Sequence, residues 1–135
     1  MRLQDQHLPE PDPHAAPFAD EAERRWGDTP QWHSAEIRRK ARTPADVSAM
    51  KAEEAALLAD WAALMRQGEP ADGAASRALA ERHREHIHRW HYPCSREMHA
   101  MLAQLYEADE RFAGHFDAVA PGLAQHVIAA LRANQ

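Results

Sequence analysis

Residues 43–65 read TPADVSAMKAEEAALLADWAALM, and this stretch decides the fold class of the chain. Thr43 is a good N-cap, Pro44 takes the first helical position, and Asp46 stands where the carboxylate of a capping box is found. The start of a helix is therefore well specified. Its large apolar side chains recur at helical spacing and predict one buried face, made of Val47, Met50, Leu57, Leu58, Trp61, Leu64 and Met65.

The residues that follow predict a helical hairpin and a third helix. Gly68 and Pro70 interrupt the apolar pattern, and a second helix is expected over residues 74–90. Pro93 ends this helix, because the residue before a proline is pushed out of the α region. Ser95 is then placed to cap a third helix.

Two further patterns complete the chain after residue 106. Asp109 can cap a short turn that carries Phe112. A last helix, with Pro121-Gly122 near its start, is marked by Phe116, Val119, Leu123, Val127 and Leu131. Strand-like alternation is almost absent, and Ala, Glu, Arg and Leu dominate the composition. We therefore predict an all-α fold.

The N-terminal part gives weaker signals. Residues 1–17 hold four prolines among acidic and polar side chains, which predicts a disordered lead or linker. Residues 18–26 and 30–42 read as two weaker helices separated by Gly27-Asp28. The total of 135 residues suits one core, so residues 18–135 are predicted to form a single compact domain.

Composition excludes several classes of partner. Sixteen Lys and Arg are interspersed among 21 Asp and Glu, for a net charge of −5, so neither a nucleic-acid footprint nor a polybasic membrane patch is expected. No stretch is apolar enough for a membrane span or a signal peptide. A single cysteine agrees with a reducing compartment. We therefore expect a cytoplasmic location.

Cys94 is the most informative position. A thiol just before a helix N-terminus faces unpaired backbone N–H groups and the positive end of the helix dipole, which favour thiolate. His91, Arg96 and His99 are close in sequence and could add positive charge. The alternative interpretation is that Cys94 is a small buried residue filling a helix joint.

Histidines cluster in the second helix and just after its end, at positions 83, 86, 88 and 91. Two imidazoles three residues apart can share a metal, but His88 lies about 200° around the helix from His86, so three ligands do not converge. We predict no metal site and no cofactor. His83 and His86 beside Trp90 suit instead a pocket with a few polar groups on an apolar wall.

The large amphipathic side chains are efficient contacts for flat heteroaromatic ligands: Trp26, Trp32, Trp61, Trp90, Tyr92 and Tyr106. Trp61 lies within a strong apolar stripe and is predicted to be core. For Trp90 and Tyr92, next to the thiol, pocket and core are both open. Cys94 with His91 or His99 is the sole pair that could serve an enzyme, and no phosphate loop or nucleophile elbow occurs, so a binding protein is favoured over an enzyme.

The chain carries a series of short motifs, which stand in this order along the sequence: residues 23–28, 51–53, 80–83, 86, 89–90, 92, 94–95, 97–99 and 121–124. The most specific is WxYxCSxEMH at residues 90–99, because it combines an uncommon residue set with the helix-end thiol. Over residues 18–133 this pattern resembles the TipA-type antibiotic-recognition domain, the C-terminal effector domain of MerR-family transcriptional regulators.

The resemblance implies a globin-like helical domain that binds thiopeptides or other bulky peptide-like antibiotics, with resistance by sequestration or a regulatory role as the outcome. It also implies that the cysteine matching Cys94 can add to a dehydroalanine of the ligand. Because DNA-binding and coiled-coil modules are not in the sequence, a monomer is expected. His91 and Pro93 depart from the family pattern, where an aromatic and an acidic residue are expected, which leaves covalent capture open.

These observations predict a ligand groove formed by Trp26, His83, His86, Trp90, Tyr92 and Cys94. The alternatives are a sensor for an unrelated small molecule and a thiol-dependent enzyme. Residues 18–42 contain few apolar anchors to offset an ordering entropy of about 1 to 2 kcal/mol per residue. We therefore expect this segment to be loosely held and to close over the ligand, with Trp26 or Trp32 completing the pocket.

Overall fold

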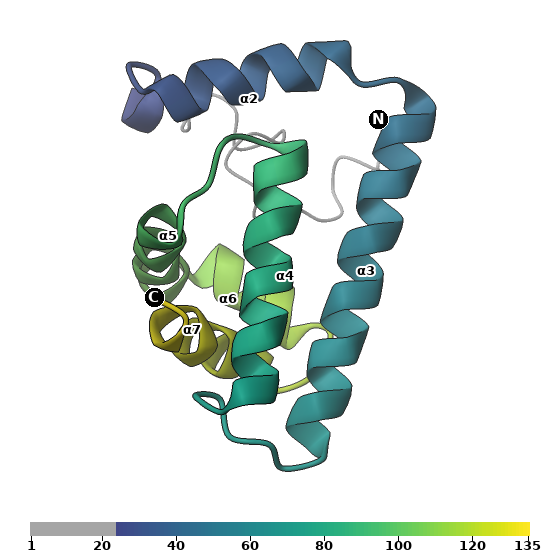
Figure 1. Cartoon of the computed structure of the whole chain (residues 1–135), viewed down its shortest axis with the longest axis vertical. Coiled ribbons are helices and arrows are strands. Elements are labelled where there is room, and N and C mark those ends of the chain that lie inside the picture. Colours follow the sequence, from purple (N-terminus) through teal and green to yellow (C-terminus); the bar gives the residue numbers. More distant parts are fainter. Residues whose placement is uncertain (1–23) are drawn as a thin grey trace.

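The computed structural model describes residues 24–135, which fold into helices joined by short turns. Helix α2 (Pro30–Ala41) is followed by α3 (Pro44–Arg66) and α4 (Ala74–Trp90), and the last two lie side by side as an antiparallel hairpin (Figure 1). The chain then forms α5 (Arg96–Ala108), α6 (Glu110–Asp117) and α7 (Leu123–Ala133). The described residues contain no strand, which confirms the all-α prediction for this part of the chain. The predicted lead at residues 1–17 lies outside the described residues.

The predicted helix starts are confirmed by their capping hydrogen bonds. The Thr43 hydroxyl accepts a hydrogen bond from the Asp46 amide at 3.1 Å, and the Asp46 carboxylate accepts one from the Thr43 amide at 3.0 Å, forming the capping box of α3. The Ser95 hydroxyl caps α5 through the Met98 amide at 3.0 Å, and the Asp109 carboxylate caps α6. Each cap contributes about 1 kcal/mol to helix stability.

The apolar pattern predicted to mark one last helix belongs to two helices. Phe112 and Phe116 are buried on α6, which ends at Asp117, and α7 begins only at Leu123. Gly122, the N-cap of α7, adopts a φ of 87°, in the left-handed region, so one right-handed helix cannot run through this position. The Asp117 carboxylate spans this turn and accepts a hydrogen bond from the Ala124 amide at 2.9 Å.

Helix α7 lies at the centre of the core, where it packs against α3, α4, α5 and α6. Its fully buried face includes Leu123, Val127, Ile128 and Leu131. Helix α3 contributes Leu57, Leu58 and Trp61, as its apolar spacing predicts, with Leu64 and Met65 packed beside them. Val47 and Met50 are only half-buried, because the N-terminal half of α3 extends past the bundle toward α2 (Figure 1).

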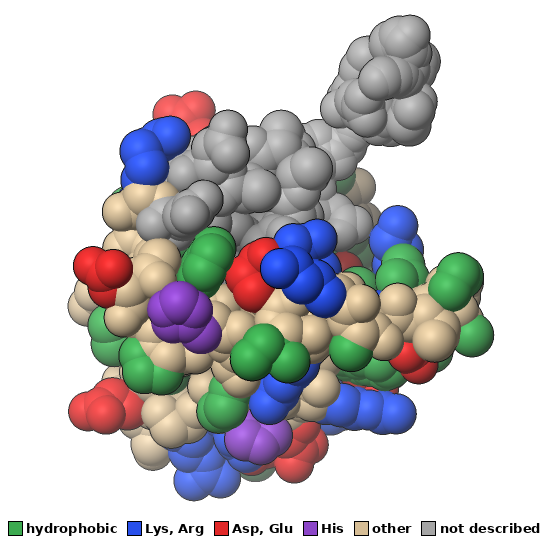
Figure 2. Space-filling model, turned by 90° about the horizontal axis from the view of Figure 1, so that it is seen from above, with side chains coloured by type: hydrophobic (Ala, Val, Ile, Leu, Met, Phe, Trp, Pro, Cys, Tyr) green, Lys and Arg blue, Asp and Glu red, His purple; other side chains and the backbone are tan. Residues whose placement is uncertain are grey.

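Helix α2 is set apart from this core. It crosses the molecule near the C-terminal end of α4 (Figure 1), and Ala35 is its one buried residue. Ile37, its largest aliphatic side chain, is 70% exposed. Seen from above, the visible surface carries interspersed positive and negative side chains (Figure 2). None of the described helices is long and apolar enough to cross a membrane.

Candidate functional site

A cleft of about 490 Å³ opens between the N-terminal segment and α5. One wall is a stripe of α5 that ranges from the buried Leu102 to exposed side chains, and it is formed by Met98, Met101, Leu102, Gln104, Leu105 and Ala108. The other wall comes from the segment before α2, the first turn of α2 and the α4–α5 joint, and consists of Arg25, Trp26, Thr29, Gln31, Trp32 and Tyr92. The volume is within the usual range for small-molecule sites.

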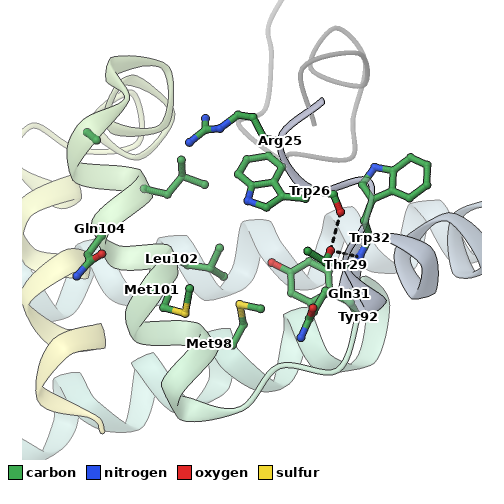
Figure 3. Close-up of a pocket in the computed structure, with 12 residues that line it drawn as sticks. Arg25, Trp26, Thr29, Gln31, Trp32, Tyr92, Met98, Met101, Leu102 and Gln104 are labelled. Atoms are coloured by element: carbon green, nitrogen blue, oxygen red, sulfur yellow. Dashed lines mark hydrogen bonds between the residues drawn. The ribbon is translucent and has the colours of Figure 1, made fainter. Parts of the chain in front are cut away.

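The two walls differ in chemistry. The side chains of Met98 and Leu102 lie on the α5 side of the cleft, across from Trp26 and Tyr92 (Figure 3). Thioethers and leucine methyl groups adapt to irregular shapes, whereas indole and phenol rings offer rigid flat faces. The cleft therefore suits a flat, largely apolar ligand inserted between an aliphatic surface and an aromatic one.

Thr29 fixes the geometry of the aromatic wall. Its hydroxyl donates to the Trp26 carbonyl at 2.7 Å and accepts from the Trp32 amide at 3.1 Å (Figure 3). The same residue is the N-cap of α2. One side chain thus sets where α2 begins and how the two tryptophans are spaced. The Arg25 guanidinium stacks over the Trp26 ring at 4.5 Å, which gives this wall a positive rim.

Of the residues predicted for the groove, Trp26 and Tyr92 line this cleft, and so does Trp32. His83, His86, Trp90 and Cys94 do not line it, and a ligand-binding role for these four stays a prediction. The α5 residues Met98, Leu102 and Leu105 were not predicted as site residues, because their helical spacing is the same signal that marks a core face.

His83 forms a buried pair with a residue of another helix. Its Nδ1 lies 2.7 Å from Nε2 of His99, and the two rings are stacked with centroids 5.0 Å apart. In such a pair one neutral imidazole donates and the other accepts. Burial lowers the pKa of His99 to about 4 and lowers the pKa of His83 well below its usual value. The pair is therefore neutral at pH 7 and belongs to the core.

His86 and Trp90 are held by a carboxylate of α3. The Glu53 carboxylate accepts from His86 Nδ1 at 2.5 Å and from Trp90 Nε1 at 2.8 Å. Burial alone raises the pKa of Glu53, but the hydrogen bonds from His86 and Trp90 outweigh it and lower the pKa. This network joins α3 to the C-terminal half of α4. Within residues 24–135 no three metal-binding side chains gather at one point.

The predicted thiolate character of Cys94 is wrong for this conformation. The side chain is buried, and burial raises the pKa of the thiol to about 12, which the nearby Arg84 guanidinium only partly offsets. The Cys94 amide donates to His88 Nδ1 at 3.1 Å, and its carbonyl accepts from Arg84 at 2.7 Å. The residue therefore fills the α4–α5 joint, as in the alternative interpretation of the sequence.

The helical core, together with a cleft that has one aromatic and one aliphatic wall, defines a small ligand-binding domain. Residues 18–134 match the TipAS antibiotic-recognition domain, and the chain belongs to this family. The resemblance found in the sequence motifs is thereby confirmed.

Similar proteins are transcriptional regulators. The chain is 38% identical over 117 residues to the HTH-type transcriptional activator TipA of Streptomyces coelicolor, a match covering 87% of this chain and 46% of that protein. It is 32% identical over 117 residues to the HTH-type transcriptional regulator SkgA of Caulobacter vibrioides, covering 86% and 44%. The chain thus spans less than half the length of these relatives.

A solved structure shares the fold. TipAS from Streptomyces lividans, in complex with nosiheptide and described as part of a thiopeptide antibiotic multidrug resistance system, matches with a TM-score of 0.82 and 37% identity. The match covers 91% of this chain and 85% of the other. The all-helical architecture predicted from the sequence is the architecture of this family.

Proposed function

We propose that this domain binds a bulky heteroaromatic peptide antibiotic of the thiopeptide class in the cleft between Trp26, Tyr92 and α5. The observation that carries the proposal is the pairing of an aromatic wall with an aliphatic wall across one open cleft. The likeness to a nosiheptide complex supports it.

The cleft suits such a ligand on physical grounds. Thiazole and pyridine rings are flat and polarisable, so they stack on indole and phenol rings and contact methionine sulfur. The rim adds a few polar groups, among them Arg25, Gln31 and Gln104, that can hydrogen-bond to amides or ring nitrogens. Because the cleft is not an enclosed cavity, a macrocycle larger than its volume can extend beyond its walls.

Binding of the antibiotic has one of two biological roles in this proposal. A chain that acts alone sequesters the antibiotic and confers resistance, whereas the same domain joined to a DNA-binding module of the MerR type acts as its effector domain. The relatives favour the second arrangement, because both are helix-turn-helix regulators that extend beyond the matched segment. In either case the domain is a monomeric cytoplasmic binding protein and does not contact nucleic acid itself.

Covalent capture by Cys94 is a second step in this proposal. The thiol is buried, so the joint between α4 and α5 must open before the sulfur can reach a dehydroalanine. The thiolate adds to the alkene carbon, and the resulting carbanion takes a proton, which gives a thioether. Non-covalent binding in the cleft therefore comes first and does not depend on Cys94.

Calorimetric titration with nosiheptide and other thiopeptides tests the proposal. Trp26→Ala removes the ring that faces α5 and is expected to weaken binding roughly 10- to 100-fold, the range for a buried aromatic anchor. Ile37→Ala, an apolar truncation on exposed α2 outside the cleft, is the matched control and is expected to bind like the native chain. Absence of binding to every thiopeptide favours a sensor of another small molecule, and turnover lost in Cys94→Ala favours a thiol enzyme.

A further inference from the structure

Helix α2 carries part of the cleft wall but has little apolar contact with the core. Trp32 lines the cleft from its first turn, whereas Ala35 is the one α2 residue that is buried. Burial of a single alanine offsets little of the ordering entropy of a 12-residue helix. Polar contacts must therefore position α2.

Two arginines of this segment reach the C-terminal end of α4. Arg38 Nη1 donates to the carbonyl of His88, and Arg42 Nη2 donates to the carbonyl of Trp90. Arg42 Nη2 also lies 3.3 Å from His91 Nδ1. These contacts join residues 48 to 50 positions apart in the sequence.

The acceptors are backbone carbonyls of the last turn of α4, which have no hydrogen-bond partner within the helix. The last carbonyls of an α-helix have no partner inside the helix, and the helix dipole concentrates negative charge there. At this end the amides of His91 and Tyr92 both bond to the Ile87 carbonyl. The carbonyls of His88 and Trp90 are satisfied from α2, by cations that the dipole attracts.

We infer that Arg38 and Arg42, here called the arginine clamp, are positioning residues for the ligand-binding cleft. The arginine clamp fixes α2 to the end of α4, and Tyr92 lies two residues after that end. It therefore sets the spacing between two parts of the aromatic wall, Trp32 on α2 and Tyr92 on the α4–α5 joint. This inference rests on the proposed function for its effect on affinity, but the attachment of α2 can be measured without ligand.

Arg39 provides a matched control on the same helix. Its guanidinium pairs with Glu36 of α2 itself, at 2.6 Å, and lies on the exposed side. Removing this charge changes the composition of α2 as much as removing a clamp charge does. It leaves both bonds to α4 intact.

The test compares amide hydrogen exchange and nosiheptide affinity in the full chain, the double variant Arg38→Gln/Arg42→Gln, and Arg39→Gln. We expect the double variant to lose exchange protection in α2 while α3 to α7 keep theirs, and to bind nosiheptide about tenfold more weakly, as for loss of about 1.4 kcal/mol. Arg39→Gln is expected to match the native chain in both measurements. Arg42→Lys, which keeps the charge but not the planar guanidinium, is expected to retain part of the affinity.

Unchanged protection of α2 in the double variant overturns the inference. So does loss of protection with unchanged affinity, because α2 then does not govern the cleft. If the native chain binds no thiopeptide, the proposed function fails, and the exchange measurement alone supports or overturns the attachment of α2 by the arginine clamp.

Discussion

Lowering the pH from 7 to 5 is expected to destabilise the domain through its buried histidine pair. His83 and His99 are 95% and 99% buried and bonded to each other. Their pKa values are lowered in the folded chain because burial disfavours the charged imidazolium. Both histidines ionise freely in the unfolded chain, near pH 6.5.

The direction and size of the change in stability follow from the difference in bound protons between the folded and unfolded states. Because the folded pKa is lowered, the unfolded state binds more protons below pH 6.5, so stability is highest above that pH and falls as the pH falls toward about 4. With the pKa of His99 at about 4, the loss between pH 7 and pH 5 is roughly 2 kcal/mol from this residue alone. His83 adds a loss of the same sign.

Urea unfolding at several pH values between 5 and 7 measures this dependence. His99→Gln keeps a neutral hydrogen-bonding group next to His83 but cannot ionise, so its stability is expected to vary less steeply with pH than that of the native chain. His33→Gln, at an exposed position of α2, is the matched control and is expected to keep the native pH dependence. Native stability that stays constant from pH 7 to 5, or an unchanged pH dependence in His99→Gln, would show that the buried pair does not destabilise the domain at low pH.

Three other predictions concern single positions. Cys94 is buried with a raised pKa, so iodoacetamide is expected to label it at least about 100-fold more slowly in the folded chain than in urea; equal rates contradict the buried joint. Trp61 is fully buried, and within the described residues its Nε1 has no hydrogen-bond partner. Trp61→Phe is therefore expected to cost much less stability than the roughly 3 to 5 kcal/mol of Trp61→Ala. Similar losses of stability in the two variants, measured by thermal unfolding, would show that the indole N–H matters. Gly122→Ala strains a φ of 87° and is expected to cost about 1 to 2 kcal/mol, whereas Gly114→Ala, inside α6 with open space around it, is expected to stabilise by up to about 1 kcal/mol.

The helices of the core could be predicted from local signals. Thr43, Ser95 and Asp109 cap the helices that they were predicted to cap, because a capping hydrogen bond joins neighbours in the sequence. The break between α6 and α7 was harder to predict from the sequence. Apolar spacing continued across Gly122, and a left-handed φ is a property of the folded turn.

The site was harder to predict, because its geometry depends on partners that are distant in sequence. His83 and His86 fall near one stripe of α4, and this suggested a shared pocket wall. Their actual partners are His99 and Glu53, which are 16 and 33 residues away. Cys94 also depends on tertiary partners that local sequence does not reveal. Its position before a helix could be predicted, whereas the burial that raises its pKa comes from tertiary packing.

NMR of methyl groups with nosiheptide shows whether the ligand lies between the aromatic wall and α5. We expect shifts and ligand contacts at the methyl groups of Met98, Met101 and Leu105, which line the cleft and are not fully buried. Methyl groups of the buried core, such as those of Leu57 and Ile128, are expected to shift little. If saturating nosiheptide leaves the α5 methyl groups unchanged and shifts residues elsewhere, the ligand does not bind in this cleft.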